Sequence, residues 1–330
     1  MKSNQAKAVI MMATYNGEKY IEEQIKSLLN QTFTNWDLYI SDDGSSDQTL
    51  SILNKYKSRD HRIKKILHHT MHHGAFNNFF NVINYVKSIP NESYDYFFYC
   101  DQDDIWIDKK MENEIQCLKK ETRPALCYSD LEFITEEGTD TDSKMSDYTD
   151  IDVTSNPYNL FFSCRYIGGT TMAHNRLLWE RMYVDENTGK YNISHDNYVG
   201  KYAALFGKII FINRPLVLYR RTGNNVSGTP GNYNKLGLIK RLFTKLPLIF
   251  NQHAAIYWED IYFVNTLNVK NKFSVGLCDA LNSGGIKALR FLRKYGIRTS
   301  DSIISNTSIK MILLLNLYKH TKTFNRKLPF

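Results

Sequence analysis

The chain has 330 residues, 42% of them hydrophobic and 23% charged, which excludes general disorder and allows one large domain with an appendage, or two domains. The net charge of +8 is uneven, because residues 231–330 carry 16 Lys or Arg and 4 Asp or Glu, whereas residues 1–230 carry 26 and 30. A near-neutral body with a basic tail argues against a nucleic-acid partner and indicates a tail that meets an anionic surface.

The cysteines and the apolar runs indicate in which cellular compartment the protein lies. The five cysteines are widely spaced, odd in number and without a CxxC pair, so neither a zinc ribbon nor a disulfide framework is predicted and a reducing compartment fits best. No signal-peptide pattern precedes the first apolar run, and no apolar run approaches the ~20 residues that span a bilayer. We therefore expect a cytoplasmic protein.

The first half of the chain alternates between short apolar runs and segments in which apolar residues have helical spacing. Repeated strand–helix units of this kind predict an α/β fold with a sheet flanked by helices, in which ligands bind beyond the carboxyl ends of the strands. Strands are predicted at 8–13, 36–40, 62–67, 94–100 and 125–128, and helices at 20–29, through Leu50, Leu53 and Tyr56, at 76–86, and through Met111, Ile115 and Leu118.

The second half is less regular. Residues 136–152 are acidic and lack apolar periodicity, which predicts an exposed loop. A glycine-rich turn at 167–172 enters an apolar segment, a helix is predicted at 195–206, and two closing strands are predicted at 209–212 and 216–219. After about residue 230 the sequence becomes basic and amphipathic. We therefore expect two parts, 1–230 and a mainly helical 231–330.

Two acidic clusters follow predicted strands. One runs from Asp42 to Asp47, and the other comprises Asp101, Asp103 and Asp104. Crowded carboxylates repel one another unless a cation compensates, and they suit Mg²⁺ or Mn²⁺ shared with a substrate phosphate. A single cluster would be interpreted as a solvated turn, because Asp, Gly and Ser dominate turns. Two clusters at strand ends favour one shared site.

A third acidic feature is Ser194-His195-Asp196, which leads into the predicted helix at 195–206. Asp196 can serve as a general base if it lies within hydrogen-bond reach of a substrate hydroxyl. The same residues are equally consistent with a helix N-cap.

Six short motifs occur in a fixed order over roughly residues 6–228. Each motif alone is weak, but their order is specific. The motifs are Ala13-Thr14-Tyr15-Asn16-Gly17-Glu18, Asp42-Asp43-Gly44-Ser45-Ser46-Asp47, Asp101-Gln102-Asp103-Asp104-Ile105-Trp106, Gly169-Thr170-Thr171-Met172, His195-Asp196, and Tyr219-Arg220 with the glycine-containing run at 223–228. Together these motifs resemble family 2 glycosyltransferases of the GT-A fold, in a subgroup that includes many bacterial rhamnosyltransferases. The resemblance implies a Rossmann-like mixed sheet that binds a nucleotide sugar.

The resemblance also implies an inverting, metal-dependent transfer of a sugar to a saccharide or lipid-linked saccharide acceptor in cell-surface polysaccharide synthesis. The implied donor is dTDP-rhamnose or a UDP-hexose, and the implied cofactor is Mg²⁺ or Mn²⁺. Asp196 would deprotonate the acceptor and Asp103 would bind the metal. Thr14, Tyr15, Glu18, Asp42 (at the base edge) and Asp101 would line the nucleotide; Asp104, Arg220 and Arg221 would support the site; Trp106, Gly169, Thr170 and His195 would shape the sugar side.

One departure from the family pattern concerns the late motif. Relatives often have Tyr-Arg-Gln-His-Gly there, whereas this chain has Arg221 and Thr222 in the third and fourth positions. Thr222 cannot replace an imidazole ligand. Arg221 is equally consistent with a group that neutralises phosphate and with an exposed surface residue.

Two further features are interpreted from their surroundings. His68, His69, His72 and His73 have no acidic or cysteine neighbour in the sequence and are predicted to be surface residues. The basic amphipathic stretch at 235–250, whose character returns at 309–330, indicates contact with an anionic membrane, packing on the catalytic domain, or a homodimer interface. We expect the protein at the inner face of the cell membrane, as the resemblance implies.

Two other functions remain open from the sequence. A nucleotidyltransferase would combine a similar sheet with acidic metal ligands, but it would be expected to have a glycine-rich, basic phosphate loop after the first strand. A catalytically inactive binding scaffold of the same fold is the second alternative, against which the presence of Asp42, Asp101, Asp103 and Asp196 argues.

Overall fold

The computed structural model describes residues 6–68, 73–90, 93–149, 152–162, 167–185, 188, 193–223 and 246–328. These divide into two compact units, which we describe separately. The first comprises residues 1–147 and 167–228, and the second comprises residues 148–166 and 229–330. Among the described helices, none is long and apolar enough to cross a membrane.

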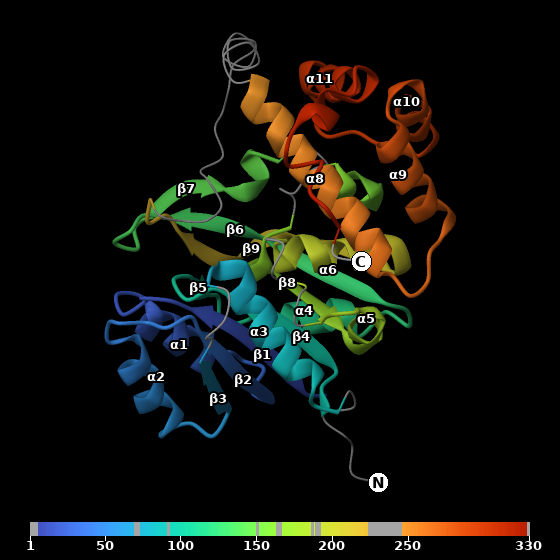
Figure 1. The fold of residues 1–330 in the computed structure, drawn as a ribbon. Helices are drawn as coiled ribbons and strands as arrows, with labels where there is room; N and C mark the ends of the chain where they lie inside the picture. The colour runs from blue at the N-terminus through green and yellow to red at the C-terminus, as the bar shows by residue number, and fades with distance from the viewer. Residues whose placement is uncertain are drawn as a thin grey trace. The chain divides into compact units, whose positions relative to one another are not determined.

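The first unit begins with a parallel sheet of the strands β1, β2, β3 and β4 (Figure 1). Every residue of β1, β2 and β4 is buried, as expected for strands covered on both faces. β1 lies between β2 and β4 and pairs in parallel with both, and β3 pairs in parallel with β2. The bounds are β1 Ala8–Thr14, α1 Ile21–Leu29, β2 Trp36–Asp42, α2 Thr49–Lys57, β3 Ile63–His68, α3 Ala75–Lys87 and β4 Tyr96–Cys100.

The sheet then becomes mixed. β8 is antiparallel to both of its neighbours, β4 and β6, and β6 pairs in parallel with β9. Within the described residues the sheet has nine strands in the order β3-β2-β1-β4-β8-β6-β9-β5, with β7 paired to β6. The bounds are β5 Ile105–Trp106, α4 Lys110–Leu118, β6 Ala125–Ile134, β7 Asp140–Lys144, β8 Met172–Asn175, α5 Arg176–Arg181, α6 His195–Phe206 and β9 Lys208–Arg220.

Two predictions for the second half of the chain are wrong. Residues 136–152 are not simply a loop, because β7 forms an antiparallel edge strand on β6, followed by a short 3-10 helix, Met145–Asp147. The two strands predicted at 209–212 and 216–219 are one strand, β9. Its register against β6 shifts twice near Asp130, which faces Pro215. This irregularity accommodates the proline and explains the interruption in the apolar pattern.

The second unit is helical in its described residues. Here α8 contacts α9, and α10 contacts both α9 and α11 (Figure 1). Aromatic side chains form much of its core, including Phe273, which lies 5.3 Å from the Phe291 ring and 3.9 Å from the Tyr158 ring. The bounds are η3 Pro157–Phe161, α8 Leu246–Thr266, α9 Lys272–Ser283, α10 Gly285–Lys294, α11 Ile303–Leu314 and η6 Leu317–His320. Most of the predicted basic stretch, 235–245, lies outside the described residues.

Candidate active site

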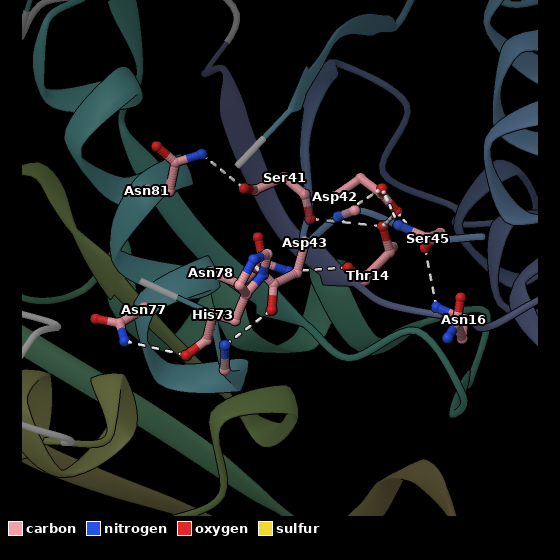
Figure 2. Close-up of polar contacts among 12 residues, drawn as sticks. Thr14, Asn16, Ser41, Asp42, Asp43, Ser45, His73, Asn77, Asn78 and Asn81 are labelled. Atoms are coloured by element: carbon pink, nitrogen blue, oxygen red, sulfur yellow. Dashed lines mark hydrogen bonds and ion pairs between the residues drawn. The ribbon is translucent and has the colours of Figure 1, made fainter. Parts of the chain in front are cut away.

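The turn after β2 is organised around the Asp42 carboxylate (Figure 2). Its Oδ2 accepts hydrogen bonds from the Thr14 hydroxyl at 2.9 Å and the Ser45 hydroxyl at 2.6 Å. Its Oδ1 accepts from the backbone N–H groups of Ser45 at 2.8 Å and Gly44 at 3.2 Å. Gly44 has φ +83°, which favours glycine. Because Asp42 is fully buried and accepts four hydrogen bonds, its side chain faces its own turn.

The loop after β1 is joined to the same turn by reciprocal hydrogen bonds. The Asn16 N–H donates to the Ser45 hydroxyl at 2.9 Å, and the Gly17 N–H donates to the Thr49 hydroxyl at 2.7 Å. The Glu18 carboxylate accepts from the Gln48 N–H at 2.8 Å, at the start of α2. Thr14 and Glu18 therefore fix the shape of this rim.

Two aromatic side chains of the rim reach solvent. Tyr15 is 54% exposed, and the His73 side chain is 69% exposed. His73 Nδ1 lies 3.0 Å from Asp43 Oδ1, while Asp43 Oδ2 accepts from the Gly74 N–H at 2.8 Å (Figure 2). His73 therefore has an acidic partner, Asp43, which is distant in the sequence and which the sequence analysis did not predict.

His68, at the end of β3, is exposed. His69 and His72 lie outside the described residues. The surface location predicted for this histidine cluster holds for its two described members, His68 and His73.

Gln102 connects this rim to the second acidic cluster. The Tyr15 N–H donates to Gln102 Oε1 at 2.8 Å, and Gln102 Nε2 donates to the Tyr15 carbonyl at 2.9 Å. A Cβ at Gly17 would lie 2.4 Å from Gln102 Oε1, so this approach needs the glycine. Sequence reasoning missed Gln102, although its position between Asp101 and Asp103 placed it at the site.

Three carboxylates, those of Asp101, Asp103 and Asp104, follow the end of β4. Burial, and then the nearby charges of Asp103 and Asp196, raise the pKa of Asp101 to about 8. Burial also raises the pKa of Asp103, and it raises that of Asp104, on which the charges of Asp103 and Asp101 act in the same direction. Asp196, in the first turn of α6, thus lies close enough to Asp101 for its charge to raise the pKa of Asp101.

The fit of this cluster to a divalent ion can be judged from its donors. Among the described residues, no group of three or more His, Cys, Asp or Glu side chains is placed to hold a metal ion. Mg²⁺ in phosphate-binding enzymes commonly takes only one or two carboxylates, with water and substrate phosphate oxygens completing its shell. Asp101 and Asp103, whose mutual repulsion a cation would relieve, fit such a partial site.

Arg220 holds the acidic loop at 101–104 in place. It is only 2% exposed, and its Nε donates to the Asp103 carbonyl at 3.0 Å while its backbone N–H donates to Asp104 Oδ1 at 3.2 Å. Its two terminal nitrogens donate to the Glu136 carbonyl at 2.9 Å and the Glu23 carboxylate at 2.5 Å. Arg220 is therefore a positioning residue for Asp103 and Asp104.

The neighbouring Arg221 lies over an aromatic ring. Its guanidinium carbon is 3.6 Å from the centroid of the Phe133 ring, and the residue is half-buried. The sequence allowed two roles for Arg221. The half-buried position excludes a fully exposed surface residue, and a contact with phosphate stays a prediction.

The four residues predicted to shape the sugar side pack together. Trp106 is 1% exposed, and its Nε1 donates to the Thr170 hydroxyl at 3.2 Å, so it supports Thr170 from within. The His195 ring stacks on Phe79 with centroids 3.7 Å apart, and neither ring nitrogen has a hydrogen-bond partner in the described structure. Burial lowers the pKa of His195 to about 4, so the imidazole is neutral at pH 7. A Cβ at Gly169 would lie 2.3 Å from its Nε2.

Comparison with protein families identifies the family to which this chain belongs. The family model described as Glycosyl transferase family 2 matches residues 9–225. The chain is a family 2 glycosyltransferase. The resemblance drawn from its motifs is confirmed, and neither a nucleotidyltransferase nor an inactive scaffold gains support from the comparison.

Named relatives of this glycosyltransferase act on activated sugars. The dTDP-rhamnosyl transferase RfbG of Shigella flexneri is 32% identical over 238 residues, which cover 69% of this chain and 79% of RfbG. The UDP-Glc:alpha-D-GlcNAc-diphosphoundecaprenol beta-1,3-glucosyltransferase WfgD of Escherichia coli is 34% identical over 111 residues, or 34% of this chain and 40% of WfgD.

Solved structures identify the fold of the glycosyltransferase. TarS 1–349 of S. aureus in complex with UDP-GlcNAc matches with a TM-score of 0.54 and 14% identity, covering 94% of this chain and 79% of that chain. The same fragment without the sugar nucleotide also has a TM-score of 0.54, at 15% identity. The predicted GT-A fold, a mixed sheet flanked by helices, is confirmed.

Proposed function

We propose that this glycosyltransferase inverts the configuration at the transferred sugar, depends on Mg²⁺ or Mn²⁺, and uses Asp196 as its general base. The observation that carries the proposal is that the ring of His195, next to Asp196 in the chain, lies 5.2 Å from the ring of Tyr99, two residues before Asp101. This packing supports one site for the base candidate and the metal-binding candidate, which are far apart in the sequence.

Each part of the site has a role in this proposal. The nucleotide lies against Tyr15 and the turn at 42–45, whose shape Thr14, Glu18 and Asp42 maintain. Asp101 and Asp103 would hold the metal, which would supply positive charge for the departing nucleoside diphosphate. Arg220 and Asp104 keep the acidic loop in place, and Arg221 contacts a phosphate. The sugar lies along the wall of Gly169, Thr170 and His195, with Trp106 behind it.

In the chemical step, a carboxylate oxygen of Asp196 accepts the proton of the acceptor hydroxyl. The hydroxyl oxygen forms a bond to the anomeric carbon as the bond to the diphosphate oxygen breaks on the opposite face. One displacement of this kind inverts the anomeric configuration. Asp196 Oδ1 already accepts a hydrogen bond from the Asn197 N–H at 2.6 Å, which holds the carboxylate in one orientation.

The donor and acceptor are proposed from the relatives. We propose dTDP-rhamnose or a UDP-hexose as donor, and a saccharide or lipid-linked saccharide as acceptor in cell-surface polysaccharide synthesis, at the inner face of the cell membrane. We also propose that residues 1–230 form the catalytic domain and that residues 231–330 provide a membrane-surface or oligomer contact.

The test is a thermal-shift and donor-hydrolysis panel with dTDP-rhamnose, UDP-glucose and UDP-GlcNAc, each with Mn²⁺, Mg²⁺ or EDTA. A donor that binds only the folded state raises the melting temperature, by mass action. We expect one donor to stabilise the protein only with metal, and Asp103→Asn to abolish this effect. Asp108→Asn, which alters an exposed aspartate on the same segment, is the matched control.

Asp196→Asn separates binding from chemistry. We expect it to keep the metal-dependent stabilisation by the donor while transfer falls by about 10²–10⁴-fold, the usual contribution of a general base. Stabilisation by no nucleotide under any metal condition would contradict the site assignment, and full transfer activity in Asp196→Asn would contradict the role of the base.

A further inference from the structure

The C-terminal part of the helical unit is strongly basic. Residues 280–328 contain ten Lys or Arg side chains and a single acidic one, Asp301. Neither α10 nor α11 contains an acidic residue. Such a concentration of cations destabilises a compact unit unless the charges face solvent or an anionic partner.

The cations of α10 share one face with an exposed aliphatic residue. Ile286 is 63% exposed, and the exposed basic residues of the helix lie within about 120° of it around the helix axis, at 100° per residue. The opposite face is buried through Ala288, Phe291 and Leu292. The exposed basic residues are Lys287, Arg290, Arg293 and Lys294.

The adjacent helix α11 repeats this arrangement. Ile303 is 83% exposed and Met311 is 46% exposed, and Lys310 and Leu314 lie on the same side of the helix. Its other side is buried through Ile309, Ile312 and Leu313. α10 and α11 contact each other (Figure 1), and each has one exposed face. We refer to these two faces together as the basic aliphatic surface.

We propose that the basic aliphatic surface binds an anionic lipid bilayer, with the aliphatic side chains entering the interface and the cations contacting the headgroups. A surface that binds single-stranded nucleic acid would offer aromatic rings for stacking, whereas none of the exposed large apolar residues of α10 and α11 is aromatic. Among the described basic residues of α10 and α11, Lys287 forms an ion pair, with Asp279 at 2.6 Å, and Lys294 lies 5.1 Å from the Tyr295 ring. The remaining charges are thus available to an anionic surface.

This inference rests on the membrane-surface contact proposed for residues 231–330 and does not depend on the glycosyl-transfer chemistry. Its test therefore measures binding without any substrate. The full chain is sedimented with vesicles of phosphatidylcholine alone or of equal parts phosphatidylcholine and phosphatidylglycerol, at low and high salt. We expect binding only to the anionic vesicles, weakened by salt because exposed charges are screened.

Two pairs of variants locate the surface. Arg290→Gln/Arg293→Gln should weaken partitioning about 25-fold, since each cation near the surface contributes about fivefold, whereas Lys119→Gln/Lys120→Gln on the first unit should not. Ile303→Ser should weaken it about tenfold, whereas Leu177→Ser, an exposed aliphatic residue of the first unit, should not. Circular dichroism confirms that each variant is folded.

Four results would overturn the proposal. The first is no binding to anionic vesicles at low salt. The second is binding that both α10 and α11 variants retain in full. The third is binding that depends on the cations but not on Ile303 and is competed away by a soluble polyanion, which would indicate an acidic macromolecule instead. A concentration-dependent mass without vesicles, lost in Ile303→Ser, would likewise assign the surface to a second copy of the chain.

Discussion

The contact between Gly169 and His195 offers a direct test of how the sugar side is built. In Gly169→Ala, the new Cβ would lie 2.3 Å from His195 Nε2 and 2.8 Å from Cε1, distances that real Cβ atoms do not show. The ring cannot easily retreat, because it is buried, stacks on Phe79 at 3.7 Å and lies 5.2 Å from the Tyr99 ring.

The expected cost follows from this confinement. Forcing a methyl group into a well-packed site costs about 1–3 kcal/mol. For a unit of this size that corresponds to a fall in melting temperature of about 2–4 °C per kcal/mol. Asp196 adjoins His195 in the chain, and a displacement of about 1 Å at a reacting group can lower the rate about 10²-fold. We therefore expect Gly169→Ala to lose both stability and kcat.

The preceding glycine provides the control. Gly168 has φ −86° and ψ 140°, which alanine adopts readily, and its Cβ would meet Thr171 only at 3.6 Å. Gly168→Ala should therefore be close to wild type in melting temperature and kcat. A double-mutant cycle with His195→Ala should show a favourable coupling free energy of about 1–3 kcal/mol, because removing the ring relieves the clash.

Equal stability and activity of Gly169→Ala and Gly168→Ala would refute the packing of His195 against Gly169. A loss in Gly169→Ala with no coupling to His195→Ala would place the clash elsewhere. Calorimetry and steady-state kinetics on the four variants distinguish these results.

Three further predictions concern buried charge. Lys110→Met should destabilise the fold by about 3–5 kcal/mol, because it leaves Glu114 fully buried without its counter-ion at 2.7 Å, whereas Lys110→Met/Glu114→Leu should recover most of this in urea denaturation. Arg220→Lys should cost about 2 kcal/mol or more in the same assay by losing its charged hydrogen bonds, and the neighbouring Arg221→Lys should cost less. Burial lowers the pKa of His174 to about 3, so between pH 6.5 and 3 the unfolded imidazole takes up a proton that the folded one refuses, and stability falls as pH falls. Between pH 7 and 4 the wild type should lose about 3 kcal/mol more than His174→Phe/Tyr99→Phe, which removes the imidazole and its hydroxyl partner together; equal losses would contradict this origin.

Much of the parallel half of the sheet could be predicted from the sequence. The strands β1, β2 and β4 are continuous apolar runs because both faces are covered, and the helices between them keep regular apolar spacing. β7 was not predicted because Asp140–Lys144 is a polar, largely exposed edge strand with no apolar alternation. The pairing of β9 with β6 holds that strand together across Pro215, which no local pattern shows.

The candidate site was predicted in position more than in detail. The acidic clusters lie at strand ends as expected, but the sequence could not show that Asp42 is buried and accepts four hydrogen bonds within its own turn. It also could not show the support of the acidic loop by Arg220, whose ion-pair partner Glu23 is 197 residues away in the chain. Hydrogen bonds of this kind depend on three-dimensional proximity and leave no periodic signal.

Strand register explains why three separate segments form one site. β1 pairs Thr14 with Asp42 on β2 and Met12 with Cys100 on β4, so the loops that follow all three strands begin at the same edge of the sheet. Side chains alternate between the two faces of a strand, so a slip of one residue would turn the Thr14 hydroxyl away from the Asp42 carboxylate and separate Gln102 from the backbone of Tyr15. The buried apolar residues of β1 therefore set the register on which the rim at 42–45 and the acidic loop both depend.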